Sequence, residues 1–240
     1  MRARLALVLG LLAAPACAEA QHLSVVQAKL VQPTDRYDHG VLGDVLEWGG
    51  LQITVAATGC GTDCPPQATL TVTLPPSQVF EDITARVVDA DGDGLAEVLV
   101  VQTDRALGAM LTVYGPKGQR VAQTKPYGQP HRWLAPAGVG DFDSDGSPEI
   151  AYIDRPHLAR ELVFVRLQQG ALVEVARLPN LTNHRIGDDF ISGGARNCGQ
   201  GDELVLASGD WSRLMVARIG GVVDLGAYSK AAMRAALACH

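Results

Sequence analysis

Asp89-Ala90-Asp91-Gly92-Asp93-Gly94-Leu95-Ala96-Glu97 and Asp141-Phe142-Asp143-Ser144-Asp145-Gly146-Ser147-Pro148-Glu149 are two copies of one pattern, D-x-D-x-D-G-x-x-E. Each copy runs directly into an apolar segment, residues 98–101 and 150–153, which we expect to be a strand. Carboxylates at alternate positions of a tight loop lie on one side of the backbone, and the glycine at position 6 permits the turn. Such a set of oxygen ligands suits a hard cation, so the sequence predicts two calcium sites.

The predicted calcium ligands are the acids at positions 1, 3, 5 and 9 of the two loops: Asp89, Asp91, Asp93, Glu97, Asp141, Asp143, Asp145 and Glu149. An EF-hand loop begins in the same way but needs a glutamate at position 12. Position 12 is Val100 in the first loop and Tyr152 in the second, so the EF-hand interpretation fails. A turn without metal is the other interpretation, because Asp and Gly are ordinary turn formers. Two copies with all four acids in register favour calcium.

The two loops also define a repeat, because Asp89 and Asp141 are 52 residues apart. A third copy near residues 195–203 keeps the closing Glu203 but has lost the first and third acids, so we expect no ion at Gly199. An earlier Asp/Gly-rich stretch covers residues 35–44. A period of this length is typical of repeat architectures. The chain divides into four units of near-equal length: residues 22–78, 79–131, 132–184 and 185–240.

Short apolar or alternating runs separated by turn residues predict sixteen strands and an all-β fold. Four strands per unit is the composition of a propeller blade. We therefore expect a single domain over residues 21–240, a small β-propeller of about four blades, or five if residues 229–240 continue the sheet. A β-sandwich is the alternative. Residues 229–238 are expected to form a short helix with Ser229 as its N-cap.

With these loops and this spacing, the chain resembles the FG-GAP/VCBS repeat family. The stretches 37–44, 132–145 and 183–194 also resemble an uncharacterised group of secreted bacterial proteins with these repeats. The resemblance implies calcium-binding propeller blades in which the loop acids are the ligands. It also implies a role in adhesion, glycan binding or scaffolding without conserved enzymatic residues.

Residues 1–20 have the parts of a secretory signal. Arg2 and Arg4 precede an apolar core over residues 5–14 that is too short to span a bilayer. Small residues allow cleavage after residue 18 or residue 20, which predicts a periplasmic or secreted protein with no membrane insertion after cleavage. A lipoprotein anchored through Cys17 is the alternative, although the residues before Cys17 make a poor lipobox.

The net charge of the whole chain is −6, and removal of residues 1–20 changes it to −7. An acidic domain of this size is expected to be repelled by nucleic acid. Cys60, Cys64, Cys198 and Cys239 remain after cleavage. An even number of cysteines in an exported chain predicts disulfides. Cys60 and Cys64 are close enough to pair locally, which leaves Cys198 with Cys239; a zinc site is the alternative.

Our candidate ligand-binding residues lie at the starts of the last two units or directly before them: Arg132, Trp133, His184 and Arg185. Arginine and aromatic side chains are the usual anchors of binding surfaces, and the expected partner is a protein or a glycan. The arginines could instead serve the fold by pairing with the aspartates after the loop strands: Asp104, Asp154 and Asp210.

A carbohydrate-active enzyme that uses rim carboxylates, similar to a glycosidase, is the alternative function. The loop acids look committed to calcium. Four spare acids form two adjacent pairs, Glu81-Asp82 and Asp188-Asp189, whose alternation predicts a solvated edge. No catalytic motif accompanies them, so the sequence favours a binding or scaffold module over an enzyme.

Overall fold

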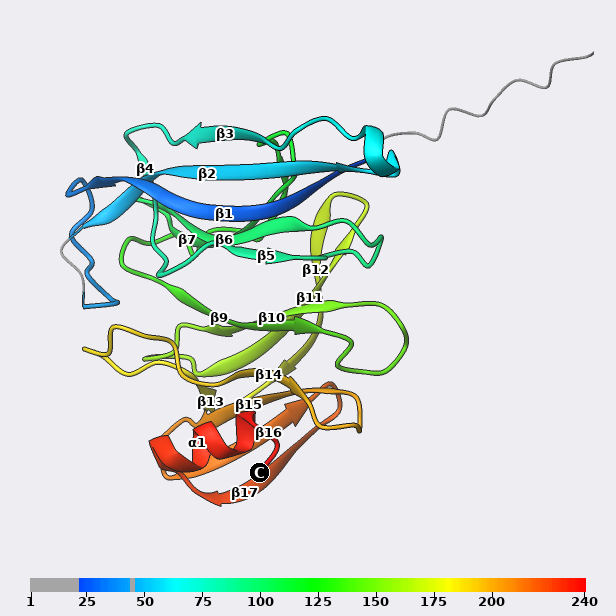
Figure 1. Cartoon of the computed structure of the whole chain (residues 1–240). Coiled ribbons are helices and arrows are strands. Elements are labelled where there is room, and N and C mark those ends of the chain that lie inside the picture. The colour runs from blue at the N-terminus through cyan, green and yellow to red at the C-terminus, as the bar shows by residue number, and fades with distance from the viewer. Residues whose placement is uncertain (1–21, 44–45) are drawn as a thin grey trace, which may run out of the picture.

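The computed structural model describes residues 22–43 and 46–240. The predicted signal segment, its Cys17 and Asp44 of the first Asp/Gly-rich stretch lie outside the described residues. The described chain is built from antiparallel strands and one short α-helix, so the all-β prediction is confirmed. Its strands form three sheets that follow one another as a stack in Figure 1.

The first sheet has eight strands: β1 (His22–Thr34), β2 (Glu47–Thr58), β3 (Ala68–Thr73), β4 (Gln78–Phe80), β5 (Arg86–Val88), β6 (Glu97–Asp104), β7 (Gly108–Tyr114) and β8 (Arg120–Gln123). The second has four: β9 (Leu134–Gly140), β10 (Glu149–Asp154), β11 (Glu161–Gln168) and β12 (Ala171–Leu178). The third has five: β13 (Leu181–Thr182), β14 (Gly194–Asn197), β15 (Asp202–Ser208), β16 (Arg213–Arg218) and β17 (Gly221–Ala227). A 3₁₀ turn at Gly61–Asp63 and helix α1 (Lys230–Leu237) complete the described elements.

Strand β6 lies between two hydrophobic cores, which explains its nearly continuous apolar sequence. Val98 and Val100 belong to one cluster together with Leu51 and Ile53 of β2. The intervening Leu99 and Val101 belong to a second cluster that also contains residues of the second and third sheets. Alternate side chains of a strand point to opposite faces, so β6 is buried from both sides.

The central strands β6 and β15 each pair, on one side, with a strand that is interrupted and continues as a second strand. Both β4 and β5 pair with β6, and both β13 and β14 pair with β15. The break between β4 and β5 contains Glu81 and Asp82, and the break between β13 and β14 contains Asn183 and His184. All four side chains are buried. The solvated edge predicted for Glu81-Asp82 is therefore wrong, because leaving the strand turns these acids into the interior.

The predicted closed propeller is wrong for the described chain. Trp48 of β2 pairs with Phe80 of β4, so the first two groups of strands share one continuous sheet instead of forming separate blades. At the other end of the stack, α1 packs Met233 and Ala236 against Val205, Leu214 and Val216 of the third sheet. The helix thus covers a face that a neighbouring blade would need for ring closure. Figure 1 shows the first sheet and α1 at opposite ends of the stack.

The predicted helix and both predicted disulfides are confirmed. The Ser229 side chain accepts a hydrogen bond from the Ala232 amide, as an N-cap does. Cys60 is bonded to Cys64, and Cys198 is bonded to Cys239, just beyond α1. Two disulfides indicate an oxidising, extracytoplasmic environment. Within the described ranges, no helix is long and apolar enough to cross a membrane.

The two disulfides are expected to contribute unequally to stability. Replacing Cys198 and Cys239 together by serine should lower the free energy of unfolding by about 4 kcal/mol, because this bond closes a long loop, and the Cys60→Ser, Cys64→Ser pair should cost about 2 kcal/mol. The sequence separations are 41 and 4. Denaturant unfolding of both double variants measures the difference, and an equal or larger loss in the Cys60/Cys64 variant would contradict it.

Candidate functional site

Each complete acidic loop is closed by hydrogen bonds from its own backbone to its acids. In the first loop, Asp89 accepts from the Gly92 amide at 2.7 Å and from the Gly94 amide at 2.9 Å. In the second, Asp141 accepts from the Asp145 and Gly146 amides, both at 3.0 Å. The glycines at position 6 have φ of +86° and +90°, a conformation that favours glycine.

The closing glutamate and the second loop residue fix each loop to the core. Glu97 accepts from the Ala90 amide at 3.0 Å, and Glu149 accepts from the Phe142 amide at 2.9 Å. Ala90 and Phe142 are both buried, and the Phe142 ring lies 5.4 Å from that of Phe164 on β11. Each loop is therefore held at both ends, with its remaining acids toward solvent.

The loops bring acidic groups close enough to hold metal ions. Oxygens of Asp89, Asp91 and Glu97 lie within 4.8 Å of one another, and the same is true of Asp141, Asp143 and Glu149. The position-5 acids, Asp93 and Asp145, are outside these groups. Each uses one carboxylate oxygen to accept a backbone amide two residues on, Leu95 at 2.8 Å and Ser147 at 2.9 Å.

The two loops differ because an arginine enters the second one. Arg166 of β11 contacts Asp143 and Asp145, each at 2.8 Å, and also binds the buried Glu149. Among the described residues, the first loop has no ion pair with any cationic side chain. The donor set of the first loop thus fits a divalent cation directly, whereas that of the second already surrounds a guanidinium.

Strand register explains this difference. Val98, Ile150 and Leu204, the residues that follow the closing glutamates, pair with Tyr114, Val165 and Ala217. The next residue on the partner strand therefore lies beside the glutamate. That residue is Gly115 in the first case, Arg166 in the second and Arg218 in the third. This position on the neighbouring strand thus places an arginine beside the second and third closing glutamates and none beside the first.

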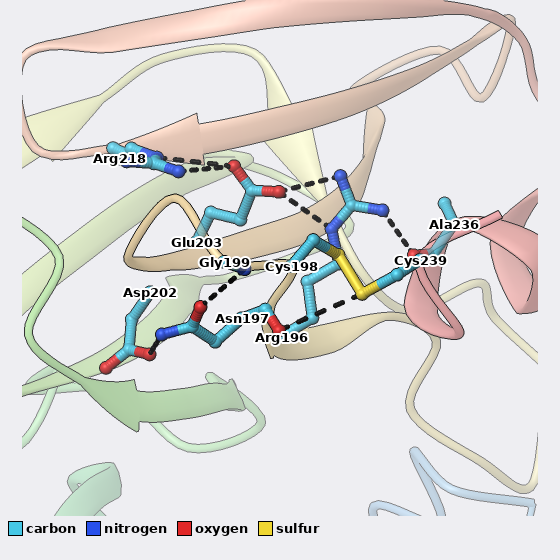
Figure 2. The surroundings of a disulfide bond; sticks show 9 residues. All are labelled: Arg196, Asn197, Cys198, Gly199, Asp202, Glu203, Arg218, Ala236 and Cys239. Carbon is cyan, nitrogen blue, oxygen red and sulfur yellow. Dashed lines mark hydrogen bonds and ion pairs between the residues drawn. A yellow bond between two sulfur atoms is a disulfide. The ribbon is translucent and has the colours of Figure 1, made fainter.

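The third loop is held without acids at its first positions. Asn197 pairs with Asp202, which leaves four residues in the turn, whereas Val88 and Glu97 enclose eight. Figure 2 shows Glu203 between the guanidinium groups of Arg196 and Arg218, at 2.7 and 2.9 Å, beside the disulfide. Arg196 also donates to the carbonyl of Ala236 in α1. Arginines and the disulfide stabilise this turn.

The pKa values of the three closing glutamates change with the number of arginines in the described chain that contact them: none at Glu97, one at Glu149 and two at Glu203. Burial raises the pKa of Glu97 to about 7; the Ala90 amide opposes the rise, and the Asp91 and Asp93 charges add to it. Burial also raises the pKa of Glu149, but Arg166 offsets part of that rise. Burial acts in the same direction on Glu203, yet Arg218 and Arg196 outweigh it and lower its pKa. The first loop is the one in which negative charge is least compensated.

The two complete loops lie next to each other. A side chain added at Gly92 would come within 3.0 Å of Pro148, and residues of both loops line one shallow cleft. Asp202 of the third sheet accepts a hydrogen bond from the Asp141 amide at 2.9 Å. The acidic loops therefore form one continuous negative region along an edge of the sheets.

A second cluster of polar and aromatic residues gathers around buried Trp133. The indole Nε1 donates to the carbonyl of Glu81 at 3.0 Å, and the ring meets that of His184 edge-on at 5.2 Å. The Glu81 carboxylate binds His39 and accepts from the Thr103 hydroxyl. His184 is 2.9 Å from His157. A row of hydrogen bonds and one aromatic contact thus runs from His39 to His157.

The four predicted binding residues separate into two places. Arg132 and Trp133 line a small cavity, and His184 contacts both Trp133 and His157 at its wall. Arg185 lies elsewhere, with its guanidinium 4.3 Å from the centre of the Trp211 ring. Neither arginine makes an ion pair with another residue that the structure describes. The aspartates proposed as their partners bind other groups, Asp154 for instance binding Arg155 and Arg177.

Sequence reasoning missed three residues of these sites: Arg166, Glu81 and His39. Arg166 gives no local signal, because it is 17 residues from Glu149 and reaches it only through strand pairing. His39 and Glu81 are 42 residues apart. The one sequence feature that could have indicated Arg166 is the arginine in the corresponding place of the next unit, Arg218.

No protein-family model matches the chain, and a search of curated proteins finds no match. The resemblance to FG-GAP/VCBS repeats therefore stays a prediction that rests on the two loops. Function has to be argued from the sites themselves.

Arg166 is expected to stabilise the second loop in the absence of metal. Arg166→Gln should lower the free energy of unfolding in EDTA by roughly 2–4 kcal/mol, because Glu149 would be left buried without its counter-charge. Arg218→Gln is the matched control and should cost less, since Glu203 keeps Arg196. Denaturant unfolding compares the two, and a larger loss for Arg218→Gln would disprove the role given to Arg166.

Proposed function

We propose that this protein is an exported binding or scaffold module of the cell envelope or the extracellular space, stiffened by calcium in its acidic loops. The observation that supports this best is the first loop. It holds three carboxylates within 4.8 Å of one another, and none of its four acids has an arginine, lysine or histidine partner among the described residues.

The chemistry of the donors favours calcium. Carboxylate oxygens are hard ligands, and the loops offer no sulfur or imidazole, the ligands that softer metals prefer. Extracellular calcium modules bind at around 10⁻⁴–10⁻³ M, a range suited to the oxidising compartment that the disulfides indicate. Asp89, Asp91 and Glu97 would hold the ion of the first loop, and Asp93 would contribute if its free oxygen turned inward.

We infer a weaker site in the second loop. Calcium there has to displace Arg166 from Asp143, Asp145 and Glu149, and the Arg166 side chain is only 16% exposed. Asp141 makes no contact with Arg166 and remains available as a first ligand. As the calcium concentration rises, the first loop is thus expected to fill before the second.

The binding or scaffold role is supported by the stacked sheets and by the FG-GAP/VCBS resemblance, which implies adhesion or scaffolding. The loops contact neighbouring parts of the stack. Ser24 of β1 accepts from the Ala96 amide at 2.9 Å, and Asp202 accepts from Asp141. A cation that orders the first loop would therefore also stabilise its contact with β1, and one in the second loop would stabilise the contact between the second and third sheets.

Calcium is expected to raise the melting temperature of the wild type, and EDTA to lower it. Binding to the folded state alone stabilises by about 2.7 kcal/mol when calcium is a hundredfold above Kd. Asp91→Ala should remove most of this shift, whereas Asp143→Ala should leave most of it, because the first loop binds more tightly. Thermal melts with and without millimolar calcium measure both effects.

Asp63→Ala is the control for the loss of one negative charge, since Asp63 lies in the turn between Cys60 and Cys64, outside both loops. It should leave the calcium shift unchanged. Titration calorimetry gives the stoichiometry directly. A folded wild type that binds no calcium would refute the proposal, and equal losses in Asp91→Ala and Asp143→Ala would refute the order of the sites.

A further inference from the structure

A small cavity lies where three segments far apart in the sequence meet: residues 39–41, 131–133 and 155–158. Five of the side chains that line it are histidines or arginines: His39, His131, Arg132, Arg155 and His157. None of its lining residues is acidic. This is unusual in a chain whose net charge is −6.

The carboxylates that pair with these groups do not belong to the cavity wall. Glu81 is fully buried beside His39, Asp38 binds His131 at 3.1 Å, and Asp154 binds Arg155 at 2.6 Å. Arg132 donates to the carbonyl of its neighbour His131 and makes no ion pair with any described residue. Its guanidinium is the cation of the cavity that lacks an internal counter-charge.

Two of the imidazoles are held in fixed orientations. His39 is bound through Nδ1 to the buried Glu81. His184 donates from Nε2 to the carbonyl of Asp188, so its Nδ1 accepts from Nε2 of His157. Burial, together with the positive surroundings from His184, His39 and Arg160, lowers the pKa of His157 to about 4. His157 is thus a neutral ring in a fixed orientation, and the unpaired positive charge of the cavity is that of Arg132.

The rest of the wall is apolar. Trp133 is buried at the back, and Leu158 is 61% exposed, the most exposed residue among the exposed leucines. Ligand pockets commonly combine apolar walls with a few fixed polar groups that select the ligand. Arginine forks in particular match the two oxygens of a carboxylate or a phosphate.

We propose that this cavity binds a small organic anion, a carboxylate or phosphate attached to an apolar group, with Arg132 as the principal anchor and Leu158 at the rim. The site names a ligand class for the binding role proposed above and rests on that role, but it does not depend on calcium. An anion of this kind would find its counter-charge at Arg132 and an apolar surface at Trp133 and Leu158.

Benzoate and phenyl phosphate are suitable probes, with benzyl alcohol as the uncharged counterpart. In an NMR titration of the full mature chain, at least one anion should shift the imidazole resonances of His39 and His157, and benzyl alcohol should not. Arg132→Gln should weaken binding roughly tenfold, the loss expected for one charge-assisted hydrogen bond. Arg120→Gln, an exposed arginine on β8, is the matched control.

Leu158→Glu tests the site without touching the interior, because it places a negative charge on an exposed rim position. It should abolish anion binding, whereas Val223→Glu, at a position that is also 61% exposed, should not. Failure of both anions to bind, or equal binding by Arg132→Gln and Arg120→Gln, would overturn the proposal. A calcium titration of the same sample separates this outcome from failure of the calcium loops.

Discussion

A carboxylate that is buried, or nearly so, near the start of each central strand has to be compensated inside the protein. Glu97 and Glu149 lie under their loops and accept a backbone amide from the second loop residue, and Glu203 lies between two guanidinium groups. A buried charge without partners would cost several kcal/mol. The loop, the core residue that anchors it and the neighbouring strand are all arranged around this one group.

The three loops meet this constraint in three ways. The acids of the first loop make no ion pair with any cationic side chain that the structure describes, so this loop is the one most open to a metal ion. The second surrounds Arg166 with three acids, and the third replaces most of its loop by arginines and a disulfide. Repeats that look alike in sequence therefore differ in charge balance, because the compensating residue comes from another strand and not from the loop.

This difference also marks what the sequence could predict. Some features depend only on residues that are close in sequence, so the sequence predicts them. These are the clustering of the loop acids, the Ser229 cap and the Cys60–Cys64 bond. The contacts of Arg166, like the pair of His39 with Glu81, depend on register between distant strands. The propeller was the wrong prediction because repeat counting cannot show that the sheet continues from β2 into β4, or that α1 covers the last sheet. The burial of Glu81 follows from a strand break that alternation does not reveal.

Strand β10 connects the two candidate sites, and its length explains how they coexist. Glu149 of the acidic loop is its first residue, and Arg155 of the cavity follows its last, Asp154. Six residues of strand span about 17–20 Å, roughly twice the Debye length at physiological salt. The negative loops therefore do not cancel the positive cavity. An ordered loop would nevertheless fix the start of the strand that leads into Arg155, His157 and Leu158. A cation bound at one end of β10 would then help to hold the proposed anion site in shape at the other.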